Sequence, residues 1–325
     1  MTRAARAARS AGGARGARAA RANSSRGAGS SAVRVRCPAK VNLGLWILGR
    51  RPDGYHEIDT ILQAITLEDE LLLTPEAAPG CRLVSTGRPI PGDAPNLITR
   101  AWDLLAGEAP ALRGKGVSVR LLKRIPIGAG LGGGSSDAAG LLAGANALFD
   151  LGLPPEELER FGASLGSDVP FFLRGGTARG TGRGEVLRHL RPLPPTWGVV
   201  VSPPVAVSTS WAYGLLRNRL TVGASPASIL ASAVARGDVG AAVDARFNAF
   251  EDVVLTQVPL LARLKQAFVA AGAWGALLSG SGSSLFTLAR TEVEARSVAA
   301  AIGACDADVR VVRTRERGVT VARGM

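Results

Sequence analysis

Residues 126–140 read PIGAGLGGGSSDAAG, and five of the seven residues from 128 to 134 are glycine. The apolar residues behind the glycines recur at helical spacing: Ala138, Leu141, Leu142, Ala145, Leu148 and Phe149. This periodicity predicts a helix that starts directly after the glycines, with Ser135 or Ser136 as its N-cap. A glycine loop leading into a helix presents free backbone N–H groups and the positive end of the helix dipole. The stretch therefore predicts a phosphate-binding loop rather than a flexible linker.

The same glycines also fit a dinucleotide-binding pattern, because Gly128, Gly130 and Gly133 are spaced as G-x-G-x-x-G. In that fold the preceding strand is buried on both faces and continuously apolar. Here the preceding segment ends in proline and carries four polar residues: Ser118, Arg120, Lys123 and Arg124. These features favour a half-exposed antiparallel strand and leave a nicotinamide-dependent oxidoreductase as a minor alternative. A Walker loop is excluded, because no lysine follows the glycines.

The composition is that of a globular protein of one or two domains. The chain has 325 residues, of which 46% are hydrophobic and 20% charged. No apolar run approaches the roughly 20 residues that span a membrane. The three cysteines are far apart and form no Cys-x-x-Cys pair, which argues against a disulfide framework and a zinc site and fits a reducing compartment. With only two histidines, a histidine-rich metal site is not expected.

The net charge of +13 is concentrated at the N-terminus. Residues 1–32 hold seven arginines and no acid in a sequence of alanine, arginine, glycine and serine, which predicts a disordered basic tail. The remaining +6 suits an anionic small molecule, although a basic RNA-binding protein is a second class to consider. The tail lacks the apolar core of a secretory signal. It resembles either an organelle transit peptide or an extension of a bacterial reading frame, and we favour a bacterial cytoplasm, with a plastid as the alternative.

The remaining chain predicts two domains of mixed helices and strands. Ordered structure is expected from Val33, with strands first and then a helix capped by Asn96. The exposed acid Asp168 is expected to precede a strand and a glycine-rich hairpin. Prolines cluster at 191–198 and predict a boundary there. We therefore expect a tail at 1–32, an N-terminal domain at 33–190 and a C-terminal α+β domain at 191–325, the latter with helices on an antiparallel sheet.

Three segments together resemble the GHMP kinase superfamily: CPAKVNLGL at 37–45, PIGAGLGGGSSDAAG at 126–140 and LLSGSGSSLF at 277–286. Two longer segments, 38–65 around DGYHE and 165–185 around SDVPFF, resemble the branch whose acceptor is a cytidine-diphosphate-linked methylerythritol. The resemblance implies a two-domain α+β kinase fold. Its N-terminal, ATP-binding domain would be ribosomal-protein-like, and its C-terminal domain a ferredoxin-like sandwich.

The resemblance implies ATP-dependent phosphorylation of the 2-hydroxyl of that acceptor, a step of the non-mevalonate isoprenoid pathway. ATP would be the co-substrate and would carry Mg²⁺, whose protein ligands are not assigned, and no protein-held metal site is expected. The expected partner is the small cytidyl diphosphate substrate, with no nucleic acid, no membrane and no particular oligomeric state. A sister kinase acting on homoserine or mevalonate is the nearest alternative. An aromatic residue for base stacking argues against it, because such an alcohol carries no base.

Carried over residue by residue, the resemblance makes Lys40 and Asp168 the catalytic pair. The ATP phosphates would be wrapped by Pro126, Ile127, Gly128, Ala129, Gly130, Leu131, Gly132, Gly133, Gly134, Ser135 and Ser136. Tyr55 would stack on the cytosine and His56 would read its edge by hydrogen bonding. Asn42, two residues after the lysine, would face the same pocket by strand alternation. The family also places Asn96 and Lys123 near the adenine, and the SGSGSS segment at 279–284 would shape the substrate side of the cleft.

Overall fold

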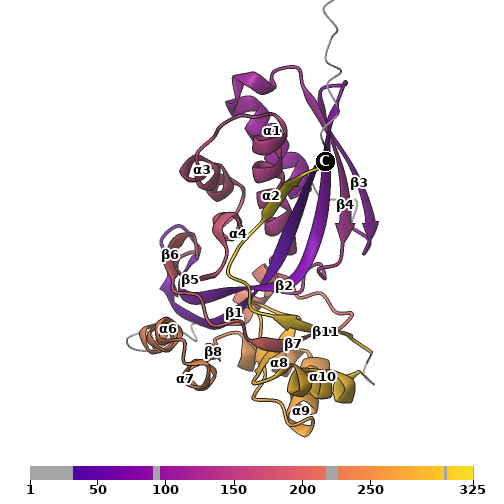
Figure 1. The fold of residues 1–325 in the computed structure, drawn as a ribbon. Coiled ribbons are helices and arrows are strands. Elements are labelled where there is room, and N and C mark those ends of the chain that lie inside the picture. The colour runs from indigo at the N-terminus through magenta and orange to yellow at the C-terminus, as the bar shows by residue number, and fades with distance from the viewer. Residues whose placement is uncertain (1–31, 91–95, 217–225, 304–305, 325) are drawn as a thin grey trace, which may run out of the picture.

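The computed structural model describes residues 32–90, 96–216, 226–303 and 306–324. Two sheets organise these residues, each with its own helices (Figure 1). All but the last residue of the predicted tail at 1–32 lies outside the described residues, as does Cys305.

The first sheet has eight strands, with the order β12-β1-β2-β4-β3, while β5 and β6 extend from β2 and β8 pairs with β1. Its strands are β1 (Val33–Arg50), β2 (His56–Glu76), β3 (Gly80–Gly87), β4 (Gly116–Lys123), β5 (Thr177–Gly182), β6 (Val186–Leu190), β8 (Phe247–Asn248) and β12 (Thr320–Arg323). Its helices are α1 (Leu97–Glu108), α2 (Gly133–Leu148), α3 (Pro155–Leu165) and the short α4 (Val169–Arg174), with a 3-10 turn at Pro110–Leu112. These helices cover one face of the sheet (Figure 1).

The second sheet is antiparallel, with the order β11-β7-β10-β9. Its strands are β7 (Trp197–Ser202), β9 (Leu277–Leu278), β10 (Leu285–Ala289) and β11 (Asp308–Arg313). The helices that follow β7 along the chain are α5 (Thr209–Leu215), α6 (Ala227–Arg236), α7 (Val239–Asp244), α8 (Glu251–Gln257), α9 (Pro259–Ala270) and α10 (Glu292–Ile302). Of these, α6 packs against β1, β2 and β6 of the first sheet. The last strand, β12, returns to pair with β1 in the first sheet. The domain boundary at residue 191 stays a prediction.

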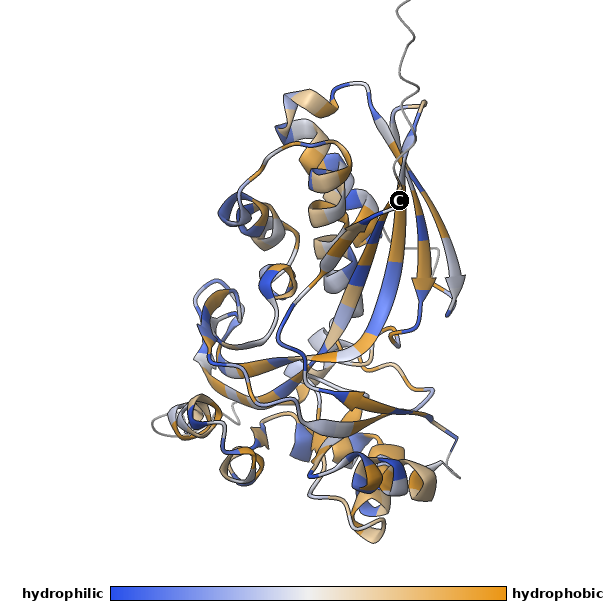
Figure 2. Cartoon of the chain, viewed as in Figure 1, coloured by the Kyte–Doolittle hydropathy of each residue, from blue (hydrophilic) through white to orange (hydrophobic). Residues whose placement is uncertain are grey.

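Strand β1 separates a core from a cavity. Ala39, Val41 and Leu43 are buried in an apolar cluster, and alternation along the strand turns Lys40 and Asn42 to the opposite face. Orange and blue segments alternate along the long strands in Figure 2, as expected for strands that bury one face against apolar neighbours. The alternation along β1 therefore buries Lys40 and Asn42 on the face opposite the apolar cluster.

Helix α2 packs very close to the sheet because small residues face it. A Cβ added at Gly140 would lie 2.3 Å from Cys37 Sγ, and one added at Gly144 would lie 2.8 Å from Val35 Cγ2. The glycine and alanine content of this helix thus sets the distance between the helix and β1. That distance in turn fixes where the N-terminus of the helix lies relative to Lys40.

Three expectations need correction. The N-cap of α2 is Gly132, not Ser135 or Ser136, because left-handed glycines let the helix begin one turn earlier than the apolar periodicity indicated. Asp168 precedes helix α4 rather than a strand. Strand β4 is antiparallel to β2 as expected, but it is mostly buried, and even Lys123 is only 4% exposed.

Among the described residues, no single helix combines the length and the apolar character needed to cross a membrane. Helices α8 and α9 reach that length and hydropathy only together, and the pair is bent by 114° at its junction.

Candidate functional site

A cavity of about 840 Å³ lies where the glycine loop, the β1–β2 pair, α4, α5 and the loop at 280–282 meet. Its lining includes Lys40, Asn42, Tyr55, His56 and Asp168, and the glycine-loop residues 126–135. Residues predicted from separate segments of the chain are thus brought together around one space. Ser136 is the exception, because it is fully buried behind the lining and its hydroxyl contacts no polar partner among the described residues.

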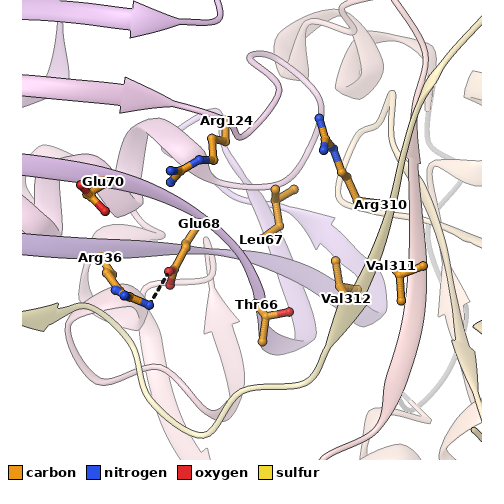
Figure 3. A pocket seen from close by; sticks show the side chains of 9 residues that line it. All are labelled: Arg36, Thr66, Leu67, Glu68, Glu70, Arg124, Arg310, Val311 and Val312. Atoms are coloured by element: carbon orange, nitrogen blue, oxygen red, sulfur yellow. Dashed lines mark hydrogen bonds and ion pairs between the residues drawn. The ribbon is translucent and has the colours of Figure 1, made fainter. Parts of the chain in front are cut away.

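A smaller hollow of about 370 Å³ lies on another part of the surface, at the junction of the two sheets (Figure 3). It is lined by side chains of both charges, among them Arg36 and Glu68, which form an ion pair there. None of the predicted site residues reaches this hollow. The larger cavity is therefore the candidate functional site.

The glycine loop is held in shape by a part of the chain far away in sequence. Gly128, Gly130 and Gly132 all have positive φ, between 66° and 76°, which side chains other than glycine rarely adopt. Ser279 donates a hydrogen bond from its hydroxyl to the carbonyl of Gly130 at 3.0 Å. A Cβ at Gly130 would lie 2.0 Å from the carbonyl oxygen of Ser279. The SGSGSS segment therefore supports the phosphate loop directly, and residues 280–282 also line the cavity, while their role on the substrate side stays a prediction.

Lys40 and Asp168 lie next to each other in the lining of the cavity. The distance from Lys40 Nζ to Asp168 Oδ2 is 3.9 Å, and Lys40 also donates a hydrogen bond to Asn42 Oδ1 at 2.7 Å. Burial lowers the pKa of Lys40, and the charge of Asp168 opposes that shift. Asp168 precedes α4 but its side chain makes no capping hydrogen bond. Its carboxylate is therefore available to a ligand.

At the other end of the cavity aromatic side chains gather. The Tyr55 ring is 56% exposed, and the guanidinium carbon of Arg183 lies 4.8 Å from its centroid. The His56 ring stacks on Tyr213, with centroids 4.5 Å apart and planes inclined by 19°. Burial and the charge of Arg50 lower the pKa of His56, so its ring is neutral at pH 7. Flat rings beside a neutral imidazole suit a planar heterocycle.

A buried ion cluster lies beneath the glycine loop. Lys123 Nζ lies 2.5 Å from Asp69 Oδ2 and 2.6 Å from Asp137 Oδ2, and all three side chains are almost completely buried. Burial opposes the charge of Lys123, but the two carboxylates outweigh it and raise the pKa of the lysine. Burial raises the pKa of Asp137 despite the neighbouring ammonium, while its Oδ1 contacts no polar partner among the described residues. Lys123 and Asp137 both line the cavity at the start of α2.

Four residues of the cavity were not predicted as site residues from the sequence: Thr60, Asp137, Arg183 and Tyr213. The first three lie inside the segments that carry the family resemblance, and Tyr213 lies outside them. The only sequence signal for Tyr213 is the rarity of its residue type, because the chain has two tyrosines; the structure places both in the lining of this cavity. Asn96, which caps α1 through a hydrogen bond from Ile98 N at 2.8 Å, also lines it, and its place near the adenine stays a prediction. In the part of the chain that the structure describes, no cluster of three histidine, cysteine or acidic side chains could hold a metal ion.

Comparisons with known proteins agree with this geometry. The family described as GHMP kinases N terminal domain matches residues 96–176, and that described as GHMP kinases C terminal matches residues 230–307. The 4-diphosphocytidyl-2-C-methyl-D-erythritol kinase of Pelotomaculum thermopropionicum is 42% identical over 85% of this chain and 96% of its own length. That of Gloeobacter violaceus is 41% identical over 88% of this chain and 96% of its own length.

Solved structures give the same result. A crystal structure of 4-(cytidine 5'-diphospho)-2C-methyl-D-erythritol kinase superimposes with a TM-score of 0.74 at 37% identity, covering 86% of this chain and 98% of the other. Homoserine kinase from Cytophaga hutchinsonii, at 23% identity and a TM-score of 0.69 over 90% of this chain and 97% of its own, shares the fold. The chain belongs to the GHMP kinase family, in the branch that these 4-diphosphocytidyl-2-C-methyl-D-erythritol kinases form. The predicted family and two-domain α+β fold are thereby confirmed.

Proposed function

We propose that the protein transfers the γ-phosphoryl group of ATP to the 2-hydroxyl of 4-(cytidine 5'-diphospho)-2-C-methyl-D-erythritol, a step of the non-mevalonate isoprenoid pathway. The observation that carries the proposal is the single cavity in which a phosphate-type glycine loop, a lysine–aspartate pair and a base-sized aromatic site meet. The named relatives catalyse this type of reaction according to their names, and the chain covers nearly their whole length.

At the reacting end, Asp168 orients the acceptor hydroxyl and accepts its proton as the new O–P bond forms. Lys40 neutralises charge that develops on the transferred group. Phosphoryl transfer depends on positioning and charge neutralisation more than on covalent chemistry, so these two side chains and the glycine loop suffice together with a magnesium ion carried by ATP. Residues 127–135 supply backbone N–H groups for the ATP phosphates at the N-terminus of α2.

At the recognition end, Tyr55 offers an exposed ring for cytosine and His56 offers polar edges. A neutral imidazole carries one donor and one acceptor, so it can discriminate bases that stacking alone would accept equally. Asn42 lines the same cavity and is hydrogen-bonded to Lys40. These three residues define the acceptor side of our proposal.

Magnesium fits this site as an ion carried by ATP. In kinase sites Mg²⁺ is held by substrate phosphates and only one or two protein carboxylates. Asp137 and Asp168 are the carboxylates that line the cavity, and Asp137 Oδ1 is a buried oxygen left without a polar partner among the described residues. Bound to the phosphates, the ion would neutralise and orient them.

The setting we propose is a bacterial cytoplasm, with no nucleic-acid or membrane partner. The named relatives come from bacteria. If the arginine-rich tail instead makes this an RNA-binding protein, RNA affinity should fall steeply with salt and be lost when residues 1–32 are deleted. RNA affinity that is weak and indifferent to this deletion is the result we expect.

The proposed function is tested by offering ATP with the cytidyl methylerythritol, homoserine and mevalonate in parallel to the full chain. We expect turnover of the cytidyl acceptor alone. Asp168→Asn should lower kcat by about 10²- to 10⁴-fold, the usual contribution of a general base, and leave the KM of ATP near the wild-type value. Asp103→Asn, on the exposed side of α1, is the matched control and should behave as wild type. Turnover of another alcohol, or an Asp168→Asn variant as fast as wild type, would contradict the proposal.

A further inference from the structure

The acceptor of the proposed reaction carries a diphosphate between its cytosine and its reacting alcohol, and the inference below rests on that proposed function. A diphosphate that enters a cavity loses its contacts with water, and cationic side chains must compensate for that loss. The question is therefore which cation on the acceptor side of the cavity remains available to it.

Among the described residues that line the cavity, the Lys and Arg side chains are Lys40, Lys123 and Arg183. Lys40 is hydrogen-bonded to Asn42 and faces the reacting carboxylate, while Lys123 is held between two buried aspartates. Neither can turn toward a second phosphate group without breaking a buried contact. His56 is neutral and adds no charge.

Arg183 differs from both lysines in its surroundings. Its side chain is 38% exposed, and its nearest acidic neighbour, Glu185, is 3.6 Å away from Nε to Oε1, longer than a hydrogen bond. No hydrogen bond of its guanidinium to another described residue is present. The Tyr55 ring, with its centroid 4.8 Å from the guanidinium carbon, holds it at the cavity by a cation–π contact. The guanidinium is thus held in place and charged, and its N–H donors have no acceptor among the described residues.

The fold explains why this arginine lies beside the base-reading residues. It occupies the tip of the β5–β6 hairpin, and β5 pairs with the start of β2, where Gly182 lies opposite Ile58. The amide of Gly182 also donates to Glu57 Oε1 at 3.1 Å, which ties the hairpin to the residue after His56. The hairpin and the β1–β2 turn lie at the same end of the sheet in Figure 1.

We propose that Arg183 binds the diphosphate of the cytidyl acceptor and so helps the enzyme to select a nucleotide-linked alcohol over a free one. The planar guanidinium presents paired N–H donors that match phosphate oxygens, a geometry that a lysine cannot reproduce. Tyr55 serves both neighbours, since its ring supports the guanidinium and offers surface to the base. Arg183 acts in acceptor binding and takes no part in the transfer itself.

The test compares Arg183→Gln with Arg188→Gln, an exposed arginine of the same hairpin that does not line the cavity. Arg183→Gln should raise the KM of the cytidyl acceptor by at least about tenfold, while the KM of ATP stays at its wild-type value. Arg183→Lys should recover part of the loss, and Arg188→Gln should behave as wild type. An unchanged acceptor KM in Arg183→Gln, or an equal rise in the KM of ATP, would overturn the proposal.

Calorimetric binding of cytidine and of cytidine diphosphate separates the phosphate from the base. Arg183→Gln should weaken binding of the diphosphate at least about fivefold more than binding of cytidine. Equal weakening of both would overturn the proposal, because it would assign Arg183 to the base platform. If the wild-type protein turns over the cytidyl acceptor but Arg183→Gln matches it, only this inference fails. If the wild type does not turn it over, the proposed function fails.

Discussion

Lys40 owes its position to a short chain of buried hydrogen bonds. Thr60 donates from its hydroxyl to the carbonyl of Gly44 at 2.7 Å and accepts from Asn42 Nδ2 at 2.9 Å. These two bonds leave the amide of Asn42 in one orientation, with Oδ1 toward Lys40. An acceptor aimed at a buried ammonium favours its charged form against the cost of burial. Thr60 is thus a positioning residue that acts on Lys40 through Asn42.

Thr60→Val keeps the shape of the side chain but removes both hydrogen bonds. The amide of Asn42 can then rotate, and the pKa of Lys40, already lowered by burial, should fall further. Because the ammonium is the active form, the alkaline limb of the kcat/KM profile should move to lower pH, with kcat reduced about tenfold at neutral pH. Thr60→Ser retains the hydroxyl and should keep the wild-type profile. A Thr60→Val profile that coincides with wild type would refute this role.

At the scale of the elements, the cluster of Lys123, Asp69 and Asp137 joins β4, β2 and α2. Asp69 also accepts the backbone N–H of Ile125 at 2.8 Å, so the cluster fixes the chain where it leaves β4 for the glycine loop. Such a buried cluster contributes little net stability when complete, but losing one member leaves an uncompensated charge.

Lys123→Met should therefore lower the free energy of unfolding by about 3–5 kcal/mol. The loss should shrink as pH falls. Without its cation, Asp137 has a still higher pKa, so the folded state binds a proton that the unfolded state releases, and stability rises toward acid pH. Urea unfolding at pH 8 and pH 5 measures both effects. Arg296→Met removes an exposed helical ion pair with Glu292 and should cost no more than about 1 kcal/mol. A similar small cost for Lys123→Met would refute the argument.

Local sequence patterns predicted helices and strands well. The features that they did not predict depend on contacts between distant segments of the chain. The helix capped by Asn96 was found because its cap and its apolar face are written in adjacent residues. Lys123 led us to predict a half-exposed strand. Its burial could not be foreseen from nearby residues, because its partner Asp69 lies 54 residues away. The motif residues of the cavity were located from sequence, and their catalytic and binding roles stay predictions. Thr60 and Tyr213 lacked any local pattern that distinguishes them from ordinary core residues.

At the scale of the whole molecule, the last described strand lies beside the first. Strand β12 pairs antiparallel with β1, with Val33 opposite Arg323, and the amide of Gly324 donates to the carbonyl of Ala32 at 2.7 Å. Four mostly exposed residues give no sequence pattern that would announce this return to the first sheet. The two-domain architecture was predictable from the order of motifs, but this crossing of the chain was not.

A chain that stops after Gly318 should therefore destabilise the N-terminal half of the protein. The truncation removes β12 and leaves the backbone edge of residues 33–36 of β1 unpaired on that side, which favours association between molecules. We expect a lower Tm and light scattering on heating, measured against a control that lacks only Met325. Truncated protein with the wild-type Tm and no scattering would show that β12 is dispensable.

The contact between Gly130 and Ser279 has a consequence for how such proteins diversify. The hydroxyl of Ser279 and the amide of Ser284, which bonds to the carbonyl of Ala129 at 3.1 Å, shape a loop that lies about 150 residues earlier in the chain. A hybrid gene that joined the first half of this protein to the second half of a distant relative would inherit a phosphate loop without its matching support. Recombination between family members should thus be productive only when the 126–136 and 279–284 segments are exchanged as a pair.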